Sequence, residues 1–547
     1  MKCVNHGGRA TEVLVELDIA LRHYSRTQAA AEFATPPTIP STMISYLQLN
    51  KTGVVGIVLF VVLLSLFAPG DPDYFWHLKT GEHIVAQHAL PGGDVFSFTR
   101  AGQPWVLHEW LFEVLLHGVF AAGGERGVAV LTVTLALAAV ALAYGMARRI
   151  AGSSAAAWIP TAFGLLVMAG CMAPRPQMLT YLLFALYLWV LLGFKYAGNT
   201  RALFVLPPLM VVWVNAHAAY AIGIAMVLLF AACEWLAWAA APGRNREQRQ
   251  RLVRLSGVAC LVVLASLVNP GLFERWAYPF QVLGMSVNAV IQEWQSPDFH
   301  QFGPKAYLGL VLLFPMAWVY ARRKPDLTEA VLPLVFAVNG CISARHMPLA
   351  VLVLVPSIAL ALANGPLAAL AAWTLGLKPV RWYLARRGAG KELGQREFVV
   401  NWVLAATVAL CVPPYLRAQH LEHSAAAGAG VAARGAADFI AAHGTGGKLF
   451  NSYGDGGYLI YRLAPRYKVT VDGRADVYGD RFIADYLQVY GGAADWKAKF
   501  ERLAVDLAVL PLDAPIRQLL LAGAGFREVY RDRHRSVLQR DPARSGT

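Results

Sequence analysis

The chain has 547 residues, of which 57% are apolar and only 15% are charged. This composition is more apolar and less charged than that of a soluble protein of this length. Its repeated apolar runs of about 17–22 residues match the length a helix needs to cross roughly 30 Å of hydrocarbon. The net charge is +14, and the basic residues cluster in short stretches between these runs. Membrane topology explains this distribution better than a nucleic-acid partner does. The sequence therefore predicts a mainly α, polytopic membrane protein.

Residues 1–50 form a weakly patterned tail, and Met43 is a plausible alternative start that would leave residues 1–42 without a function. Arg22, Arg26 and Lys51 precede the first apolar run. Because positive charge collects on the cytoplasmic side of a membrane, we expect this tail to be cytoplasmic.

Residues 51–416 are predicted to be a transmembrane domain with about 11 spans, whose basic gaps satisfy the positive-inside rule. Its two long outer loops are residues 70–127 and 271–304. A short apolar stretch at 111–122 is interrupted by Glu113 and His117, and we interpret it as an interfacial helix instead of a span. The predicted spans are 53–67, 128–147, 154–172, 178–194, 203–219, 220–240, 255–270, 305–321, 327–343, 347–363 and 398–416.

Residues 417–547 lose the long apolar runs and are predicted to form a soluble α/β domain on the outer side of the membrane. Alternating patterns predict strands at 448–451, 468–472 and 507–512, and a terminal hairpin over 528–539. Helices are predicted at 480–490, 495–503 and 515–522.

Ionisable residues at the ends of the spans converge on one predicted face, although they are spread over 275 residues of sequence. Each could by itself be a helix cap or a residue that reaches to the lipid headgroups. Charged groups are costly near a membrane, however, so a one-sided set favours a functional site. Two carboxylates with two arginines and a histidine suit a phosphate-bearing ligand and a general base. The set comprises Asp71, Asp73, Arg175, His217, Glu293, Arg345 and His346, with the polar residues Asn215 and Asn269 on the same face.

A second polar stretch follows in the first outer loop. Glu109, Glu113 and His117 recur at i, i+4 and i+8, on one face of a helix. This spacing is compatible with a metal-binding face, but it is more typical of an amphipathic helix that lies on the membrane.

The segment Asp71-Pro72-Asp73-Tyr74-Phe75 resembles the first acidic motif of oligosaccharyltransferase catalytic subunits. The chain is similar to the GT-C superfamily of integral membrane glycosyltransferases, with a more distant resemblance to protein O-mannosyltransferases. Ser452 to Ile460 resembles a degenerate Trp-Trp-Asp-Tyr-Gly segment without its tryptophans. The pattern of Pro91, Asp94, Trp105 and the residues around them also resembles a set of uncharacterised bacterial membrane proteins.

The resemblance implies a role for each candidate residue. Asp71 and Asp73 would be catalytic, and they would bind a divalent cation, Mg²⁺ or Mn²⁺, together with Glu293. The lipid phosphate would lie on Arg175, Arg345 and His346. The remaining assignments are assistance to the acceptor or metal by Glu293, His77 and Glu109, and acceptor contacts from Asp455 and Tyr453 in the C-terminal domain.

These assignments predict an enzyme of the bacterial cytoplasmic (inner) membrane with a periplasmic or extracellular C-terminus. It would move a sugar from a polyprenyl-phosphate donor to an acceptor glycan, lipid or protein outside the cytoplasm. Two alternatives stay open: a transporter or flippase of lipid-linked or polar substrates, and a non-catalytic membrane scaffold. A transporter would need charges deep inside broken helices, whereas the charges found here lie at span ends.

Overall fold

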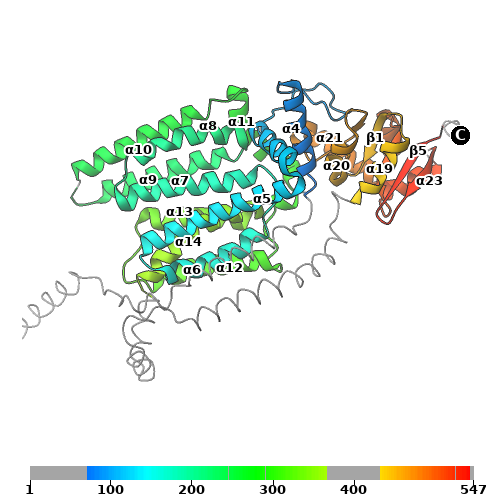
Figure 1. Ribbon diagram of the computed structural model, residues 1–547. Helices are drawn as coiled ribbons and strands as arrows, with labels where there is room; N and C mark the ends of the chain where they lie inside the picture. The colour runs from blue at the N-terminus through cyan, green and yellow to red at the C-terminus, as the bar shows by residue number, and fades with distance from the viewer. Residues whose placement is uncertain (1–70, 244, 290, 366–431, 524, 542–547) are drawn as a thin grey trace, which may run out of the picture.

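A computed structural model describes residues 71–243, 245–289, 291–365, 432–523 and 525–541 of the chain. It contains a helical bundle and, at one end of the bundle, an α/β domain (Figure 1). The predicted tail 1–50 and the predicted spans 53–67 and 398–416 lie outside the described residues.

Each of the nine predicted spans within the described residues coincides with a helix. Five helical segments are long and apolar enough to cross a membrane, and three more are apolar but shorter. The five are α5 (Trp110–Ala151), α7 (Gln177–Ala197), α9 (Tyr220–Ala240), α12 (Phe302–Val319) and Ala344–Ala363, which comprises η4 (Ala344–His346) and α14 (Met347–Ala363); the shorter ones are α6 (Ser154–Ala169), Ala202–Ala216, which comprises η1 (Ala202–Val205) and α8 (Leu206–Ala216), and α13 (Leu327–Ile342).

Helix α14 is the centre of the bundle. Nearly all of its side chains are buried, because α5, α6, α12 and α13 pack around it (Figure 1). Helix α6 approaches closely at Gly164, where a Cβ would lie 2.7 Å from the Val351 side chain. A helix that is apolar on every face belongs in such an enclosed position.

Two helices differ from the pattern of apolar residues. Helix α10 (Arg246–Ala265) begins nine residues before the predicted span 255–270, because the side chain of Asn245 accepts a hydrogen bond from the Glu247 N–H and caps a polar first turn. Helix α5 is kinked at Gly124, whose φ of 57° and ψ of −153° are not helical and favour glycine. The predicted interfacial segment 111–122 is therefore a helical segment separate from the rest of α5.

The remaining helices of this part lie at the same end of the bundle as the α/β domain. They are α4 (Tyr74–Gln87), α11 (Leu272–Leu283) and the short η2 (Ser286–Ala289) and η3 (Gln292–Trp294) (Figure 1). Helix α11 is amphipathic: Phe273, Phe280 and Leu283 are 60–70% exposed, whereas Arg275 and Tyr278 are buried.

The C-terminal domain is built on a five-stranded mixed sheet of order β2-β1-β3-β5-β4. Strands β2, β1 and β3 are parallel, and β5 runs antiparallel to both β3 and β4. All the predicted strands and helices of this domain are confirmed, and two further helices, α19 and α20, were not predicted. Its elements are α19 (Arg434–His443), β1 (Gly447–Asn451), η5 (Tyr453–Asp455), α20 (Gly456–Leu463), β2 (Tyr467–Val469), α21 (Ala475–Gly491), α22 (Trp496–Leu503), β3 (Leu507–Pro511), α23 (Pro515–Gly523), β4 (Phe526–Arg531) and β5 (Arg535–Arg540).

The loop between α4 and α5 joins this sheet at its β2 edge. Phe98 donates its N–H to the Val469 carbonyl and Val469 donates to the Phe96 carbonyl, both at 3.2 Å. The Thr99 hydroxyl donates to the Thr470 carbonyl at 2.7 Å. The first outer loop thus covers an edge that would otherwise expose unpaired backbone groups.

A buried ion triad secures the same contact. Arg474 donates to both oxygens of Asp472 at 2.7 Å and to Asp94 of the first outer loop at 2.8 Å. The side chains of all three residues are at most 1% exposed. The Arg474 guanidinium also lies 4.5 Å from the ring centroid of Trp105. One guanidinium thus faces two buried carboxylates inside the interface between the loop and the domain, and the hydroxyls of Ser97 and Tyr478 donate further hydrogen bonds to Asp94 and Asp472.

Replacing Arg474 with Met should strongly destabilise the protein, because two buried carboxylates would lose their counter-charge. Removal of one partner from a buried ion pair costs about 3–5 kcal/mol, which thermal unfolding of the detergent-solubilised chain would detect. The matched control is Arg462→Met, which removes an exposed ion pair with Asp438 and should leave the unfolding temperature nearly unchanged. Equal effects of the two substitutions would contradict the proposed importance of the triad.

Candidate active site

Asp71 and Asp73 form the turn from which α4 begins. An Oδ1 of Asp71 accepts the Asp73 N–H at 2.9 Å, and Asp73 is the N-cap residue of α4 but makes no side-chain capping bond. Its carboxylate is therefore free to face another element. Both carboxylates lie at the positive end of the helix dipole, where negative charge is favoured.

Arg175 gathers three carboxylates from distant parts of the chain. Its guanidinium lies 2.5 Å from Asp71 Oδ2, 3.1 Å from Asp73 Oδ2 and 3.0 Å from Glu293 Oε1. Arg175 sits in the turn before α7 and Glu293 sits in η3. Four of the predicted site residues are thus brought into one group, which we call the acid cluster: Asp71, Asp73, Arg175 and Glu293.

The pKa values of both Asp73 and Arg175 in the acid cluster are raised, with different consequences for their charge. Burial raises the pKa of Asp73 to about 6, against the opposing attraction of Arg175 and with a further rise from the charges of Asp71 and Glu293. Burial lowers the pKa of Arg175, but the carboxylates of Asp73, Asp71 and Glu293 outweigh it and raise that pKa above its ordinary value. Asp73 therefore changes its charge near neutral pH while Arg175 stays charged.

Arg345 and His346 lie beside the acid cluster, because η3 is bonded to the turn that carries them. Ser343 donates its hydroxyl to the Glu293 carbonyl at 3.0 Å, and Ala344 donates its N–H to the Gln295 carbonyl at 2.9 Å. The Arg345 guanidinium stacks 4.5 Å from the ring centroid of Trp294. It forms no ion pair with a carboxylate among the residues that the structure describes.

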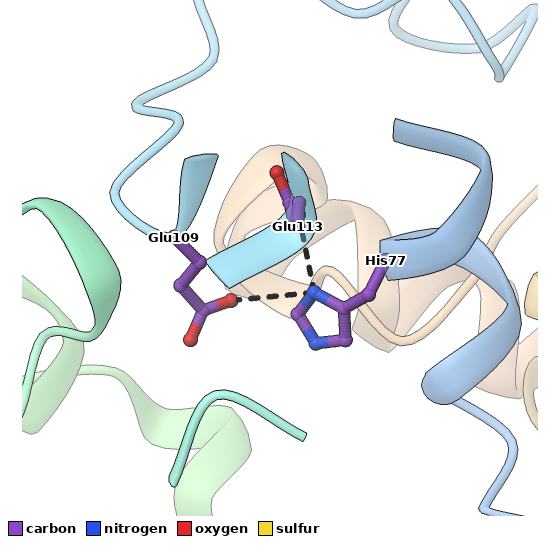
Figure 2. Close-up of side chains that lie close together, drawn as sticks. All are labelled: His77, Glu109 and Glu113. Atoms are coloured by element: carbon purple, nitrogen blue, oxygen red, sulfur yellow. Dashed lines mark hydrogen bonds and ion pairs between the residues drawn. The ribbon is translucent and has the colours of Figure 1, made fainter. Parts of the chain in front are cut away.

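One helical turn beyond Asp73 lies a second, more deeply buried group. His77 Nδ1 is 3.1 Å from Glu113 Oε1 and 3.7 Å from Glu109 Oε2 (Figure 2). The imidazole comes from α4, and the two carboxylates come from the N-cap and first turn of α5. We call these three residues, His77, Glu109 and Glu113, the His–Glu cluster.

Two further histidines face the other oxygen of Glu109. His108 Nε2 and His217 Nε2 lie 3.4 and 3.6 Å from Glu109 Oε1. A carboxylate only accepts hydrogen bonds, so the His217 tautomer that suits this contact carries its proton on Nε2. Its Nδ1 then accepts from the Thr180 hydroxyl at 2.9 Å, which itself accepts from Trp213 Nε1 at 2.8 Å.

Burial and charge shift the pKa values of this group in opposite directions. Burial lowers the pKa of His77 and of His217 to about 3, despite the attraction of Glu109. Burial by itself raises the pKa of Glu109, yet the neighbouring imidazoles, His108 first, and the hydrogen bond from His108 hold it far below its ordinary range. At neutral pH His77 is therefore neutral beside an ionised Glu109, whereas burial and the charge of Glu109 raise the pKa of Glu113 well above its ordinary value.

The C-terminal domain reaches the acid cluster through a backbone turn. A Cβ on Gly473 would lie 1.8 Å from Asp73 Oδ1, and one on Gly457 would lie 2.3 Å from the Pro72 carbonyl oxygen. Tyr453 donates its hydroxyl to the Gly473 carbonyl at 3.3 Å. Asp455, in contrast, is fully buried and is bonded by Arg535 at 2.7 and 2.9 Å within the domain.

Sequence reasoning did not identify several of these functional positions. No role was proposed for His108 or Gly473, and His217 was only placed on the same face as the other span-end residues. Glu113 was expected to line an amphipathic surface together with His117. Glu113 instead points inward to His77, and His117 does not belong to the cluster. The spacing of Glu109 and Glu113 was the available signal, but their partner on α4 could not be deduced from it.

Gly473→Ala should disturb the contact between the domain and Asp73, because the added methyl group has no space beside the carboxylate. Overpacking of this kind costs about 1–3 kcal/mol, measured by thermal unfolding. Gly491→Ala is the matched control, since a Cβ there meets nothing within 4 Å and alanine favours a helix. A Gly473→Ala protein as stable as Gly491→Ala would refute the close approach.

Similar proteins were found among solved structures but not by comparison of sequences. No protein-family model matches the chain, and no curated protein matches it. Among solved structures, ArnT from Cupriavidus metallidurans bound to undecaprenyl phosphate is 16% identical, with a TM-score of 0.50 over 91% of this chain and 98% of that chain.

The archaeal oligosaccharyltransferase AglB from Archaeoglobus fulgidus, in complex with an inhibitory peptide and a dolichol-phosphate, is 11% identical. The match has a TM-score of 0.52 and covers 84% of this chain and 69% of that chain. Identities this low relate the fold alone. At that level the resemblance that the acidic motif predicted is confirmed: the chain shares the fold of ArnT and of AglB.

Proposed function

We propose that the protein is a membrane glycosyltransferase that moves a sugar from a polyprenyl-phosphate donor to an acceptor outside the cytoplasm. The observation that carries this proposal is the acid cluster, in which Asp71, Asp73, Arg175 and Glu293 meet in space. The GT-C fold supports it, since two proteins with this fold were solved with undecaprenyl phosphate and with a dolichol-phosphate.

Asp73 is the proposed general base. It is 22% exposed, whereas Asp71 is 11% exposed, so Asp73 is the easier of the two to reach from solvent. Asp73 would take the proton of the acceptor hydroxyl or amide. At the same time the oxygen or nitrogen of the acceptor would form a bond to the anomeric carbon of the donor sugar. The bond from that carbon to the phosphate oxygen then breaks, and its electron pair leaves with the lipid phosphate. Asp71 holds Arg175 in place beside the base.

Arg345 is the proposed cation for the leaving phosphate, because Arg175 is already engaged by three carboxylates. The Arg345 guanidinium rests on Trp294 and can stabilise the negative charge that develops on the phosphate. His346 stands next to it, with an Nδ1 that is buried and has no hydrogen-bond partner among the described residues. Arg175 supports the same site electrostatically.

The route of the lipid is proposed to pass α11. Its exposed apolar residues, Phe273, Phe280 and Leu283, suit contact with the hydrocarbon boundary. On its opposite face Tyr278 contacts His108, with ring centroids 4.1 Å apart. A lipid held at α11 would thus present its phosphate close to both clusters, while Tyr453 faces the acceptor from the C-terminal domain.

In the proposed orientation the N-terminal tail is cytoplasmic and about 11 spans follow it, as the distribution of positive charges predicts. The acid cluster and the C-terminal domain would then lie on the periplasmic or extracellular side of a bacterial cytoplasmic membrane. Glu293 is the most exposed member of the cluster at 40%, so we assign it to the acceptor side of the site.

Asp73→Asn should lower sugar transfer roughly 100-fold or more, since the amide cannot accept the acceptor's proton. The assay incubates purified protein with a panel of polyprenyl-phosphate-linked sugars and measures the released polyprenyl phosphate by mass spectrometry. The surface substitution Asp438→Asn is the matched control and should keep the wild-type rate. Full transfer by a folded Asp73→Asn protein would rule out Asp73 as the base, and movement of the intact donor between leaflets without its cleavage would favour a flippase.

The pH dependence provides a second test of Asp73. A base must be ionised, so kcat/KM should fall as the pH drops through about 6, the raised pKa of Asp73, and should be level above it. His108 also has a raised pKa, from the charge and hydrogen bond of Glu109, which outweigh its burial. If Asp73 and not His108 causes the fall in kcat/KM, the fall should persist in the His108→Gln variant. A fall centred near the ordinary aspartate pKa of 3.8 would contradict the assignment.

A further inference from the structure

We infer that the His–Glu cluster is a binding site for one divalent transition-metal ion, Zn²⁺ or Mn²⁺. The ion would be held by His77 Nδ1 with one carboxylate oxygen each from Glu109 and Glu113. This site is separate from the acid cluster, where the sequence placed a cation, and the inference does not depend on the proposed sugar transfer.

The three ligand atoms already face one another. They lie within 4.8 Å of one another, and all three residues are buried. Figure 2 shows the imidazole of His77 directed between the two carboxylates. One imidazole nitrogen and two carboxylate oxygens form a donor set that suits Zn²⁺ or Mn²⁺ better than Mg²⁺, which prefers oxygen ligands and retains several waters.

A second observation points independently to a ligand. Glu113 is fully buried, yet its Oε2 has no hydrogen-bond partner among the described residues. Arg275 lies within electrostatic range of Glu113 but forms no ion pair with it. A buried carboxylate oxygen without a partner is costly, and a bound cation would supply the missing contact.

The surroundings of the cluster also match a metal site. The second oxygen of Glu109 faces His108 and His217, and His217 is fixed in turn by Thr180. Such outer partners orient the ligands of metal centres. The ring of His77 also lies against Trp76, with centroids 3.6 Å apart, which restricts its rotation.

The acid cluster is a weaker candidate for the same ion. The guanidinium of Arg175 already lies among Asp71, Asp73 and Glu293 at 2.5–3.1 Å. A cation placed there would have to displace a group that neutralises the same carboxylates. The metal expected at Asp71, Asp73 and Glu293 is thus better accommodated at the His–Glu cluster.

The ion would position the catalytic turn. His77 lies on α4, one turn after Asp73, whereas Glu109 and Glu113 lie at the start of α5. A metal bound by both helices would clamp the beginning of α4 against α5 and so fix Asp73 relative to the bundle. It would act through geometry, without touching the reacting atoms.

The experiment measures metal content in the full chain purified in detergent. The protein is treated with a chelator, divided and dialysed against ZnCl₂, MnCl₂ or MgCl₂, and bound metal is counted by mass spectrometry. We expect about one equivalent of Zn²⁺ or Mn²⁺ and little Mg²⁺. The added Zn²⁺ or Mn²⁺ should raise the unfolding temperature of the wild type, because an ion that binds the folded state stabilises it.

The isosteric variant Glu113→Gln should bind the ion at least roughly tenfold more weakly and lose the metal-induced rise in unfolding temperature. Glu82→Gln, on the surface of α4, is the matched control and should bind as the wild type does. Asp71→Asn and Glu293→Gln should also retain the metal. The inference is overturned if the wild type binds no transition metal, if Glu113→Gln retains full affinity, or if Asp71→Asn and Glu293→Gln lose the ion. Retention of metal by an inactive Asp73→Asn protein would separate this site from the catalytic proposal.

Discussion

The burial of Arg474 between Asp94 and Asp472 is the constraint on which the arrangement of the site depends. The two ends of the Arg474–Asp94 bond are 380 residues apart in sequence, so this contact, together with the backbone bonds at Val469, joins the first outer loop to the C-terminal domain. A buried charge is stable only when every donor and acceptor around it is matched, which fixes the turn 472–474. Gly473 occupies the middle of that turn and therefore lies against Asp73. The position of Asp73, the proposed base, is thus held in part by the C-terminal domain.

Two polar clusters with different environments lie along α4. In the acid cluster the exposed fraction of the side chains rises from 11% at Asp71 to 40% at Glu293, and an arginine balances the carboxylates. In the His–Glu cluster the side chains of His77 and Glu113 are at most 3% exposed. Reactions with a lipid and an acceptor need the first kind of environment. The second kind, sealed and rich in matched ligand atoms, is suited to holding α4 and α5 together.

The sequence could group the members of the acid cluster because they are charged residues at span ends or in an outer loop of the predicted topology. That topology placed Asp71, Asp73, Arg175 and Glu293 on one face, and the structure brings them into contact. Gly473 had no such signal, since its role depends on packing between elements far apart in the chain. In the same way α20 was not predicted, because it begins with two glycines, of which Gly457 is needed for close approach to Pro72 and carries no helical preference.

The difference in exposure between the acid cluster and the His–Glu cluster also decides between two roles for a bound cation. A catalytic metal needs an open coordination position that faces the substrate, whereas a structural metal is enclosed by its ligands. His77, Glu109 and Glu113 are all buried, so an ion among them would be shielded from a sugar or a phosphate. In the proposed reaction the electrostatic stabilisation of the leaving phosphate then falls to Arg345 and Arg175, which are fixed cations. Such a site would need no ion recruited in each cycle, and the ion inferred at the deeper cluster would hold the proposed base in position.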